Sequence, residues 1–208
     1  MTDEERLKSG LALPLMEDFY TIQGEGFQTG RAAYFLRVGG CDVGCSWCDV
    51  KESWNAALWP LTETDEIIRR VLDCPAKSVV ITGGEPLMYN LDYLCRELSN
   101  SGFELFLETS GSHPISGTWD WICLSPKKFS PPLPEIYNLA DEYKVIVQSV
   151  GDFDWAEKNT SRLKEGCALF LQPEWSVIDS IMEPVVEYVK ANPKWRISLQ
   201  SHKYMRIP

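Results

Sequence analysis

The 208-residue sequence lacks any apolar stretch approaching the about 20 residues needed to span a bilayer. Residues 1–8 are charged and contain no apolar signal core, so we predict a cytoplasmic protein without a membrane partner. Basic residues are also fewer than acidic ones: the sequence has 20 Lys and Arg against 30 Asp and Glu, which gives a formal net charge of −10. Nucleic-acid binding depends on Lys and Arg that displace phosphate counterions, so this charge argues against a nucleic-acid partner.

Histidine is scarce as well, with only His113 and His202, at separate places. Three of the seven cysteines, Cys41, Cys45 and Cys48, lie close together in a C-x3-C-x2-C pattern. No second C-x2-C pair is present to complete the ligand set of a closed zinc site. The clustering and the odd number of cysteines indicate metal binding in a reducing compartment rather than a disulfide framework.

The segment 39–49, Gly-Gly-Cys-Asp-Val-Gly-Cys-Ser-Trp-Cys-Asp, directly follows a predicted strand. Three thiolates on one glycine-containing loop can ligate a [4Fe–4S] cluster and leave one iron open. The amine and carboxylate of S-adenosylmethionine (SAM) can chelate that iron, and electron transfer then cleaves a C–S bond to give a carbon radical. The pattern therefore predicts a radical SAM enzyme. The alternative is a protein without enzymatic activity, an interaction module that binds zinc or iron.

Short apolar runs, often β-branched, alternate with amphipathic segments along the chain. Strands are predicted at Ala32–Val38, Ser78–Thr82, Phe103–Glu108, Trp121–Leu124, Tyr143–Val147, Ala168–Gln172 and Trp195–Leu199. Helices are predicted after a capping box at residues 62–65, after Asn90, and over Asp152–Leu163 and Val177–Lys190. This alternation predicts an α/β fold with a mainly parallel sheet. The helices are too few for a complete barrel, so we expect one domain over residues 1–208 that forms a partial barrel or an open α/β sheet.

Polar residues follow several predicted strands at their carboxyl ends, where parallel α/β folds bind ligands. The turn Thr82-Gly83-Gly84-Glu85-Pro86 is the second motif, because its glycines allow close backbone approach and Glu85 can accept hydrogen bonds from an ammonium group. Similar polar ends occur at residues 108–111, 125–127 and 172–175. We expect them to border one shared cleft.

The sequence around these motifs resembles the 7-carboxy-7-deazaguanine synthase family of the radical SAM superfamily. The resemblance is carried by the cysteine triad, the Gly-Gly-Glu-Pro turn, the segment Phe19-Tyr-Thr-Ile-Gln-Gly-Glu-Gly26, Arg37 and the ending Gln200-Ser-His-Lys-Tyr-Met-Arg-Ile-Pro208. It covers nearly the whole chain, from about residue 17 to residue 208, although residues 51–60 and 130–141 carry little of it.

The resemblance implies a carbon–nitrogen lyase that converts 6-carboxy-5,6,7,8-tetrahydropterin to 7-carboxy-7-deazaguanine with loss of ammonia. This ring contraction is a step toward queuosine and other 7-deazapurines. It also implies a modified, incomplete barrel of the radical SAM type, a homodimer, and an external electron donor of the flavodoxin or ferredoxin type. A different radical SAM reaction, such as activation of a glycyl-radical enzyme, is the rival enzymatic interpretation.

The resemblance also assigns roles to individual residues. The cluster ligands are expected to be Cys41, Cys45 and Cys48. The SAM site is expected to be lined by Trp47, Cys48, Asp49, Gly84, Glu85, Ser125, Pro126, Lys127, Gln172, Pro173, Glu174 and Trp175. The pterin is expected to meet Ile22, Gln23, Gly24, Glu25, Arg37, Thr82, His202 and the terminal Pro208. Carboxylate and amide groups suit the donor-rich pyrimidine edge, and the Arg37 fork suits a carboxylate.

One position departs from the family pattern. Family members often carry Thr two residues after the last cluster cysteine, where its hydroxyl helps to hold Mg²⁺ against the substrate. Val50 occupies that position here and has no side-chain oxygen. Because Mg²⁺ prefers oxygen ligands, we expect weak or absent Mg²⁺ dependence.

Overall fold

The computed structural model describes residues 1–208, built around a nine-stranded sheet with the order β3-β1-β2-β4-β5-β6-β7-β8-β9. The strands are β1 (Ala12–Ile22), β2 (Ala32–Val38), β3 (Leu61–Glu63), β4 (Ser78–Gly83), β5 (Glu104–Thr109), β6 (Trp121–Leu124), β7 (Glu142–Val147), β8 (Ala168–Pro173) and β9 (Trp195–Ile197). β2 and β4 to β9 are parallel, whereas β1 runs antiparallel to both β2 and β3. Because β3 and β9 do not pair, the sheet stays open.

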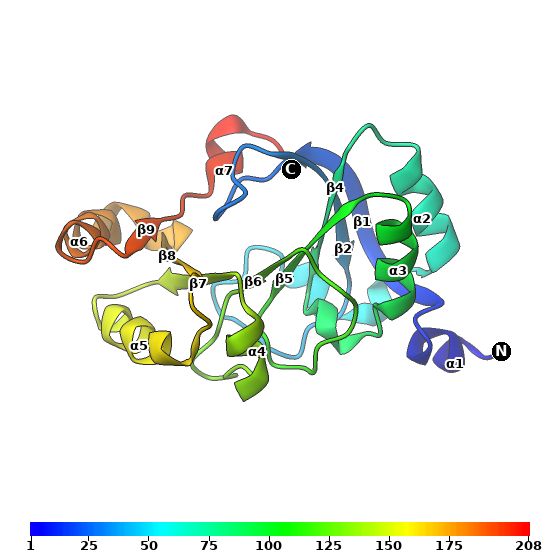
Figure 1. The fold of residues 1–208 in the computed structure, drawn as a ribbon, viewed down its shortest axis with the longest axis horizontal. Helices are drawn as coiled ribbons and strands as arrows, with labels where there is room; N and C mark the ends of the chain where they lie inside the picture. The colour runs from blue at the N-terminus through cyan, green and yellow to red at the C-terminus, as the bar shows by residue number, and fades with distance from the viewer.

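Helices α2 to α6 lie between strands of the sheet and cover its convex side, whereas α7 lies on the opposite side (Figure 1). The helices are α1 (Asp3–Lys8), α2 (Thr64–Leu72), α3 (Asp92–Asn100), α4 (Pro134–Leu139), α5 (Gly151–Asn159), α6 (Ile178–Ala191) and α7 (Ser201–Met205). Short 3-10 turns are η1 (Lys51–Trp54), η2 (Ala56–Leu58), η3 (Pro86–Met88), η4 (Thr160–Arg162) and η5 (Trp175–Val177). None of these helices has both the length and the apolar character that crossing a membrane requires.

Two apolar clusters attach the helices to the sheet. One packs α2 and α3 against β1, β2, β4 and β5 through residues such as Ile67, Leu94 and Ile81, all fully buried. The other packs α4, α5 and α6 against β6 to β8 through residues such as Ile136 and Val185. Burial of one such side chain contributes about 2 kcal/mol, so these rows hold the strands in register.

On the opposite, concave face of the sheet the side chains change from apolar to polar along the strands. A small apolar row crosses it in register, with Phe35 beside Val80 and Val80 beside Phe106. Two residues further along, the side chains that share this face are polar, and Arg37 lies beside Thr82. The carboxyl ends of the parallel strands therefore present polar groups above an apolar layer.

The predicted α/β class, the mainly parallel sheet and the incomplete barrel are confirmed. Every predicted strand is present, and β2 and β6 have the predicted bounds. The four predicted helices correspond to α2, α3, α5 and α6, but α5 ends at Asn159 and a 3-10 turn follows it instead of helix.

Two local predictions were wrong or incomplete. The capping box does not form, because Thr62 lies in β3 and the Thr64 hydroxyl donates to the carbonyl of Gly10 at 2.7 Å. Pairing with distant parts of the chain thus engages Thr62 and Thr64, which the capping box was expected to use. The long strand β1 and the helices α1, α4 and α7 were not predicted, since short or mixed polar segments lack a clear period.

Candidate functional site

The cysteine loop (residues 39–50) follows β2 and is held in place mainly by backbone groups. The amide of Gly40 donates to the carbonyl of Ser53 at 2.6 Å, and the amide of Cys41 donates to the carbonyl of Trp54 at 3.1 Å. Gly40 has φ +100°, a conformation that glycine adopts without strain, and a Cβ there would overlap the Tyr89 hydroxyl. The loop therefore depends on glycine at this position.

The three cysteines of this loop line one cavity. Cys45 is buried, whereas Cys41 and Cys48 are half-buried. Burial raises the pKa of the Cys41 and Cys45 thiols, although the Lys127 ammonium opposes this for Cys45. Both thiols are therefore protonated at neutral pH, and iron would have to displace their protons.

The donor set fits a [4Fe–4S] cluster better than a single ion. No group of three or more His, Cys, Asp or Glu side chains lies close enough to ligate one metal ion. A cluster takes each cysteine on a different iron atom, so its ligands need to surround a volume and need not converge on a point. Three thiols from one loop, facing a cavity, meet that requirement.

The cavity encloses about 670 Å³ at the carboxyl ends of the parallel strands. This volume lies within the range of about 300–1,000 Å³ that is usual for small-molecule sites. The cavity is lined by every predicted site residue except Pro126. Pro126 instead borders a neighbouring hollow of about 200 Å³, together with Trp47 and Lys127.

Glu85 has a different environment from the one predicted. Its side chain is only 1% exposed, and one carboxylate oxygen accepts from the Thr109 hydroxyl at 2.6 Å and the Leu87 amide at 3.1 Å. The other accepts from the Ser110 amide at 2.8 Å and the Ser110 hydroxyl at 2.5 Å. All four acceptor positions of the carboxylate are filled, so Glu85 joins two strand ends and has no capacity left for an ammonium group.

A buried lysine was missed by the sequence analysis. Lys144 lies in β7, its side chain is 4% exposed, and its ammonium contacts the carboxylates of Glu25 at 2.7 Å and Glu108 at 3.0 Å. We call Glu25, Glu108 and Lys144 the charged floor; all three line the cavity. A charged residue within an apolar run that predicts a buried strand was the signal available, because such charges require partners.

The charges of this floor are stable at neutral pH. Burial disfavours the ammonium of Lys144, but the anionic groups around it, Glu108 and Glu25 among them, raise its pKa well above the usual value. Burial would raise the pKa of Glu25, but the charge and hydrogen bond of Lys144 lower it to about 2. The floor therefore carries one positive and at least one negative charge.

The C-terminal segment borders the cavity beside the loop that follows β1. The amide and the hydroxyl of Ser201 both donate to the carbonyl of Gly24 at 2.9 Å. Gln200 donates to Glu25 at 2.9 Å, and a Cβ on Gly24 would overlap the His202 ring. Figure 1 shows this contact as the red helix α7 next to the blue segment after β1.

Arg37 extends from β2 into the same cavity. Its Nε donates to a carboxylate oxygen of Glu17 at 2.6 Å, and its guanidinium lies over the Phe19 ring. The two terminal nitrogens make no hydrogen bond within the protein and can bind an anionic group as a fork.

Comparison with known proteins agrees with this geometry. The radical SAM superfamily profile matches residues 36–165. A 7-carboxy-7-deazaguanine synthase from Flavobacterium psychrophilum is 52% identical over 202 residues, covering 97% of this chain and 96% of the relative. The chain belongs to the 7-carboxy-7-deazaguanine synthase family. The synthase of the same name from Synechocystis is 44% identical and covers 95% of this chain.

A solved structure has the same fold. The crystal structure of QueE from Escherichia coli superposes with a TM-score of 0.83 and 30% sequence identity, covering 97% of this chain and 99% of that one. Membership of the radical SAM superfamily implies a [4Fe–4S] cluster and SAM as cofactors. The three cysteines and the adjoining cavity are the groups that would hold them.

The side chains near Val50 carry few free oxygen atoms. Val50 borders the cavity without a side-chain oxygen, and the neighbouring Asp49 carboxylate already contacts the Lys203 ammonium at 3.1 Å. The Lys203 ammonium also donates to the side-chain oxygen of Gln200 at 3.0 Å. A divalent cation at this point would meet an ammonium group where it needs oxygen ligands.

Proposed function

We propose that this protein is a 7-carboxy-7-deazaguanine synthase, a carbon–nitrogen lyase that contracts the ring of 6-carboxy-5,6,7,8-tetrahydropterin and releases ammonia. The product would feed the synthesis of queuosine or other 7-deazapurines. The observation that carries the proposal is that one cavity joins the cysteine loop to a carboxylate-lined floor and the free fork of Arg37. These are the groups that a reductive radical reaction on a small polar heterocycle with a carboxylate needs.

In this proposal each wall of the cavity has its own task. The cluster and SAM, when bound, supply the electron and the carbon radical. The terminal nitrogens of Arg37 bind the substrate carboxylate, while Glu25 and Gln23 accept from and donate to the pyrimidine edge. The C-terminal segment, held by Ser201 and ending in Pro208, covers the bound substrate and keeps water away from the reactive carbon.

The rival enzymatic reaction has less support. An activase must accommodate a backbone loop of a partner protein, whereas this cavity is bordered by buried charges that suit a compact donor-rich ring. A non-enzymatic metal module would not need the charged floor at all, because buried charges are costly to maintain.

We also propose a homodimer, an external electron donor of the flavodoxin or ferredoxin type, and little or no Mg²⁺ requirement. The first two rest on the family resemblance, and the third rests on Val50 and on the contact between Lys203 and Asp49. Light scattering in solution would test the first proposal. Reduction of the cluster by purified flavodoxin and ferredoxin would test the second.

The decisive experiment is an anaerobic turnover assay. The reconstituted protein receives SAM, a strong reductant and 6-carboxytetrahydropterin, with and without Mg²⁺, and the products are identified by mass spectrometry. We expect 7-carboxy-7-deazaguanine in both conditions, and none from Cys45→Ala, which removes a cluster ligand. Cleavage of SAM without a deazapurine product would leave the radical chemistry in place and refute the substrate.

A further inference from the structure

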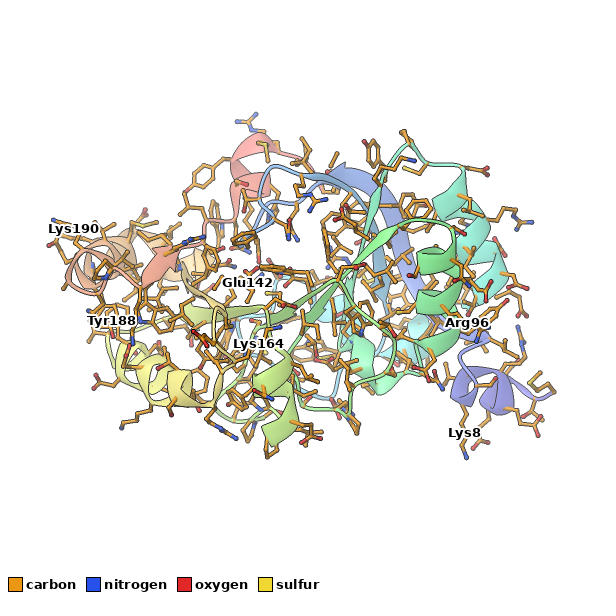
Figure 2. All side chains as sticks on the ribbon, viewed as in Figure 1. Lys8, Arg96, Glu142, Lys164, Tyr188 and Lys190 are labelled. Atoms are coloured by element: carbon orange, nitrogen blue, oxygen red, sulfur yellow. The ribbon has the colours of Figure 1, made fainter.

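The charged floor has a property that neither the motifs nor the family name explains. Lys144 is buried at the base of the cavity and divides its ammonium between two carboxylates from distant parts of the chain, Glu25 and Glu108. A third carboxylate, Glu142, lies two residues before it on the same face of β7, and Figure 2 shows Glu142 near the centre of the molecule. A single cation therefore organises a group of acids that would otherwise repel one another.

The two carboxylates still have acceptor positions that no group of the protein occupies. Glu25 accepts from Lys144 on one oxygen and from Gln200 on the other. Glu108 accepts from Lys144 at 3.0 Å on one oxygen and from Gln23 at 3.3 Å on the other. Gln172 also hydrogen-bonds Glu25, and the Cys123 thiol hydrogen-bonds Glu108. Because a carboxylate has four acceptor positions, at least one position on each carboxylate remains for a ligand.

We propose that Lys144 is a positioning residue that holds Glu25 and Glu108 as a paired acceptor for the N–H donors of a 2-aminopyrimidinone ring. By this means it selects a pterin over the analogue in which oxygen replaces the 2-amino group. The inference deepens the proposed function and rests on it. Lys144 itself makes no contact with substrate in this scheme and acts through the two acids.

The selection follows from the chemistry of the two rings. A pterin presents adjacent ring and amino N–H groups, which pair with a carboxylate as a fork. A lumazine presents a carbonyl oxygen at the same place, so an acceptor faces an acceptor and a buried carboxylate loses its partner. Sites built to bind a donor reject analogues that lack it, because the unpaired polar group remains buried.

The loss of the lysine has a predictable consequence for this selection. Without the ammonium, the carboxylates of Glu25 and Glu108 repel each other across the same small volume and tend to separate or to take up a proton. A protonated carboxyl group can donate as well as accept, so it no longer distinguishes an amino group from a carbonyl. We therefore expect the loss of Lys144 to reduce the ratio of affinities for the two rings. The effect on this ratio should be larger than the effect on the free energy of unfolding.

The test compares ligand binding by the cluster-loaded, SAM-bound but unreduced protein, so that no turnover occurs. Calorimetric titration measures the dissociation constants of 6-carboxypterin and 6-carboxylumazine for the wild type, Lys144→Met, Lys144→Arg and Lys190→Met. Lys190 pairs only with Glu187 on the exposed side of α6 and lies at the edge of the molecule in Figure 2, so Lys190→Met is the matched control. Cluster absorbance and SAM affinity report whether each variant remains folded.

We expect the wild type and Lys190→Met to prefer 6-carboxypterin by about tenfold or more. Lys144→Met should bind both compounds with nearly equal, weaker affinity, and Lys144→Arg, which keeps the charge, should recover part of the preference. If Lys144→Met does not fold, Lys144→Gln removes the charge with a similar side-chain length. A tenfold preference that persists in the charge-free variant overturns the inference.

The same titrations separate this inference from the proposed function. A wild type that binds both compounds without preference refutes the role of Lys144 and leaves the reaction untouched. A wild type that binds neither compound contradicts the substrate assignment and the inference with it.

Discussion

Two walls of one cavity are built in opposite ways. The cysteine loop is fixed by backbone hydrogen bonds and by two glycines that leave no room for a side chain: Gly40 within the loop, and Gly84 in the turn after β4 that packs against it. The charged floor is fixed by side-chain ion pairs between residues from three distant strands or loops. The cysteine loop should therefore be sensitive to substitutions that add volume, and the charged floor should be sensitive to substitutions that change charge.

The strongest test of this contrast is Gly84→Ala. The new Cβ would overlap the carbonyl oxygen of Gly40, while the Gly84 amide is tied to the Val38 carbonyl at 2.9 Å. The cysteine loop must shift, at a cost of up to about 3 kcal/mol, so we expect about a hundredfold loss of turnover and a matching loss of bound iron. Iron analysis and the turnover assay measure both.

Gly151→Ala is the matched control for this change. A Cβ at Gly151 would meet only the Ser149 hydroxyl at 3.7 Å, an ordinary contact, and α5 begins at this residue. Wild-type iron content in Gly84→Ala would contradict the idea that close backbone approach holds the cysteine loop.

A weaker but more specific effect is expected from Glu25→Gln in the charged floor. The folded-state pKa of Glu25 is lowered from the ordinary value of 4.5 to about 2, chiefly because Lys144 outweighs burial. The carboxylate therefore stabilises the fold fully above pH 4.5, and this contribution disappears as the pH falls toward 2. We expect Glu25→Gln to lower the free energy of unfolding by about 1–2 kcal/mol at pH 7, and by less at acidic pH.

Urea denaturation of the metal-free chain at several pH values measures this difference. Glu187→Gln, in the exposed pair with Lys190, is the control and should show no pH-dependent gap of comparable size. A gap between wild type and Glu25→Gln that stays constant from pH 7 to pH 3 would mean that the ion pair does not hold the floor together.

The smallest effect is expected where the two walls meet. Val50→Thr adds a hydroxyl oxygen near Asp49, but the Lys203 ammonium remains at 3.1 Å from that carboxylate. We therefore expect Mg²⁺ to change the turnover of the wild type little and that of Val50→Thr by about twofold. Initial rates after chelation and after addition of Mg²⁺ decide this, and a wild type that is inactive without Mg²⁺ would refute it.

The contrast between the walls also explains what could be predicted from the sequence. The cysteine spacing and the Gly-Gly-Glu-Pro turn are local patterns, and both motifs lie where strand ends were expected. Strands β2 and β6 were predicted with their observed bounds, because continuous apolar runs are typical of buried parallel strands. Strand β1 was missed since Glu17 and Asp18 interrupt its apolar pattern, and only pairing with β2 and β3 defines it.

Glu85 and Lys144 mark the limit of such reasoning. The turn made Glu85 a reasonable partner for an ammonium group, but Thr109 and Ser110 from the next strand end fill its acceptor positions. Lys144 belongs to no motif, and its importance depends on Glu25 and Glu108, which lie 119 and 36 residues away along the chain. Partners at such separations leave no local pattern.

By itself, the sequence determined the chemistry that this protein can perform: three thiols on one glycine loop, an alternating α/β chain and the resemblance to a family with a defined reaction. These features are local, because ligand spacing and hydrophobic period are set within a few residues. The tertiary structure alone decided which charges meet at the base of the cavity and which carboxylates remain free to accept a ligand. Hydrogen-bonding capacity and burial belong to the assembled site, since each depends on every group that the fold brings into contact.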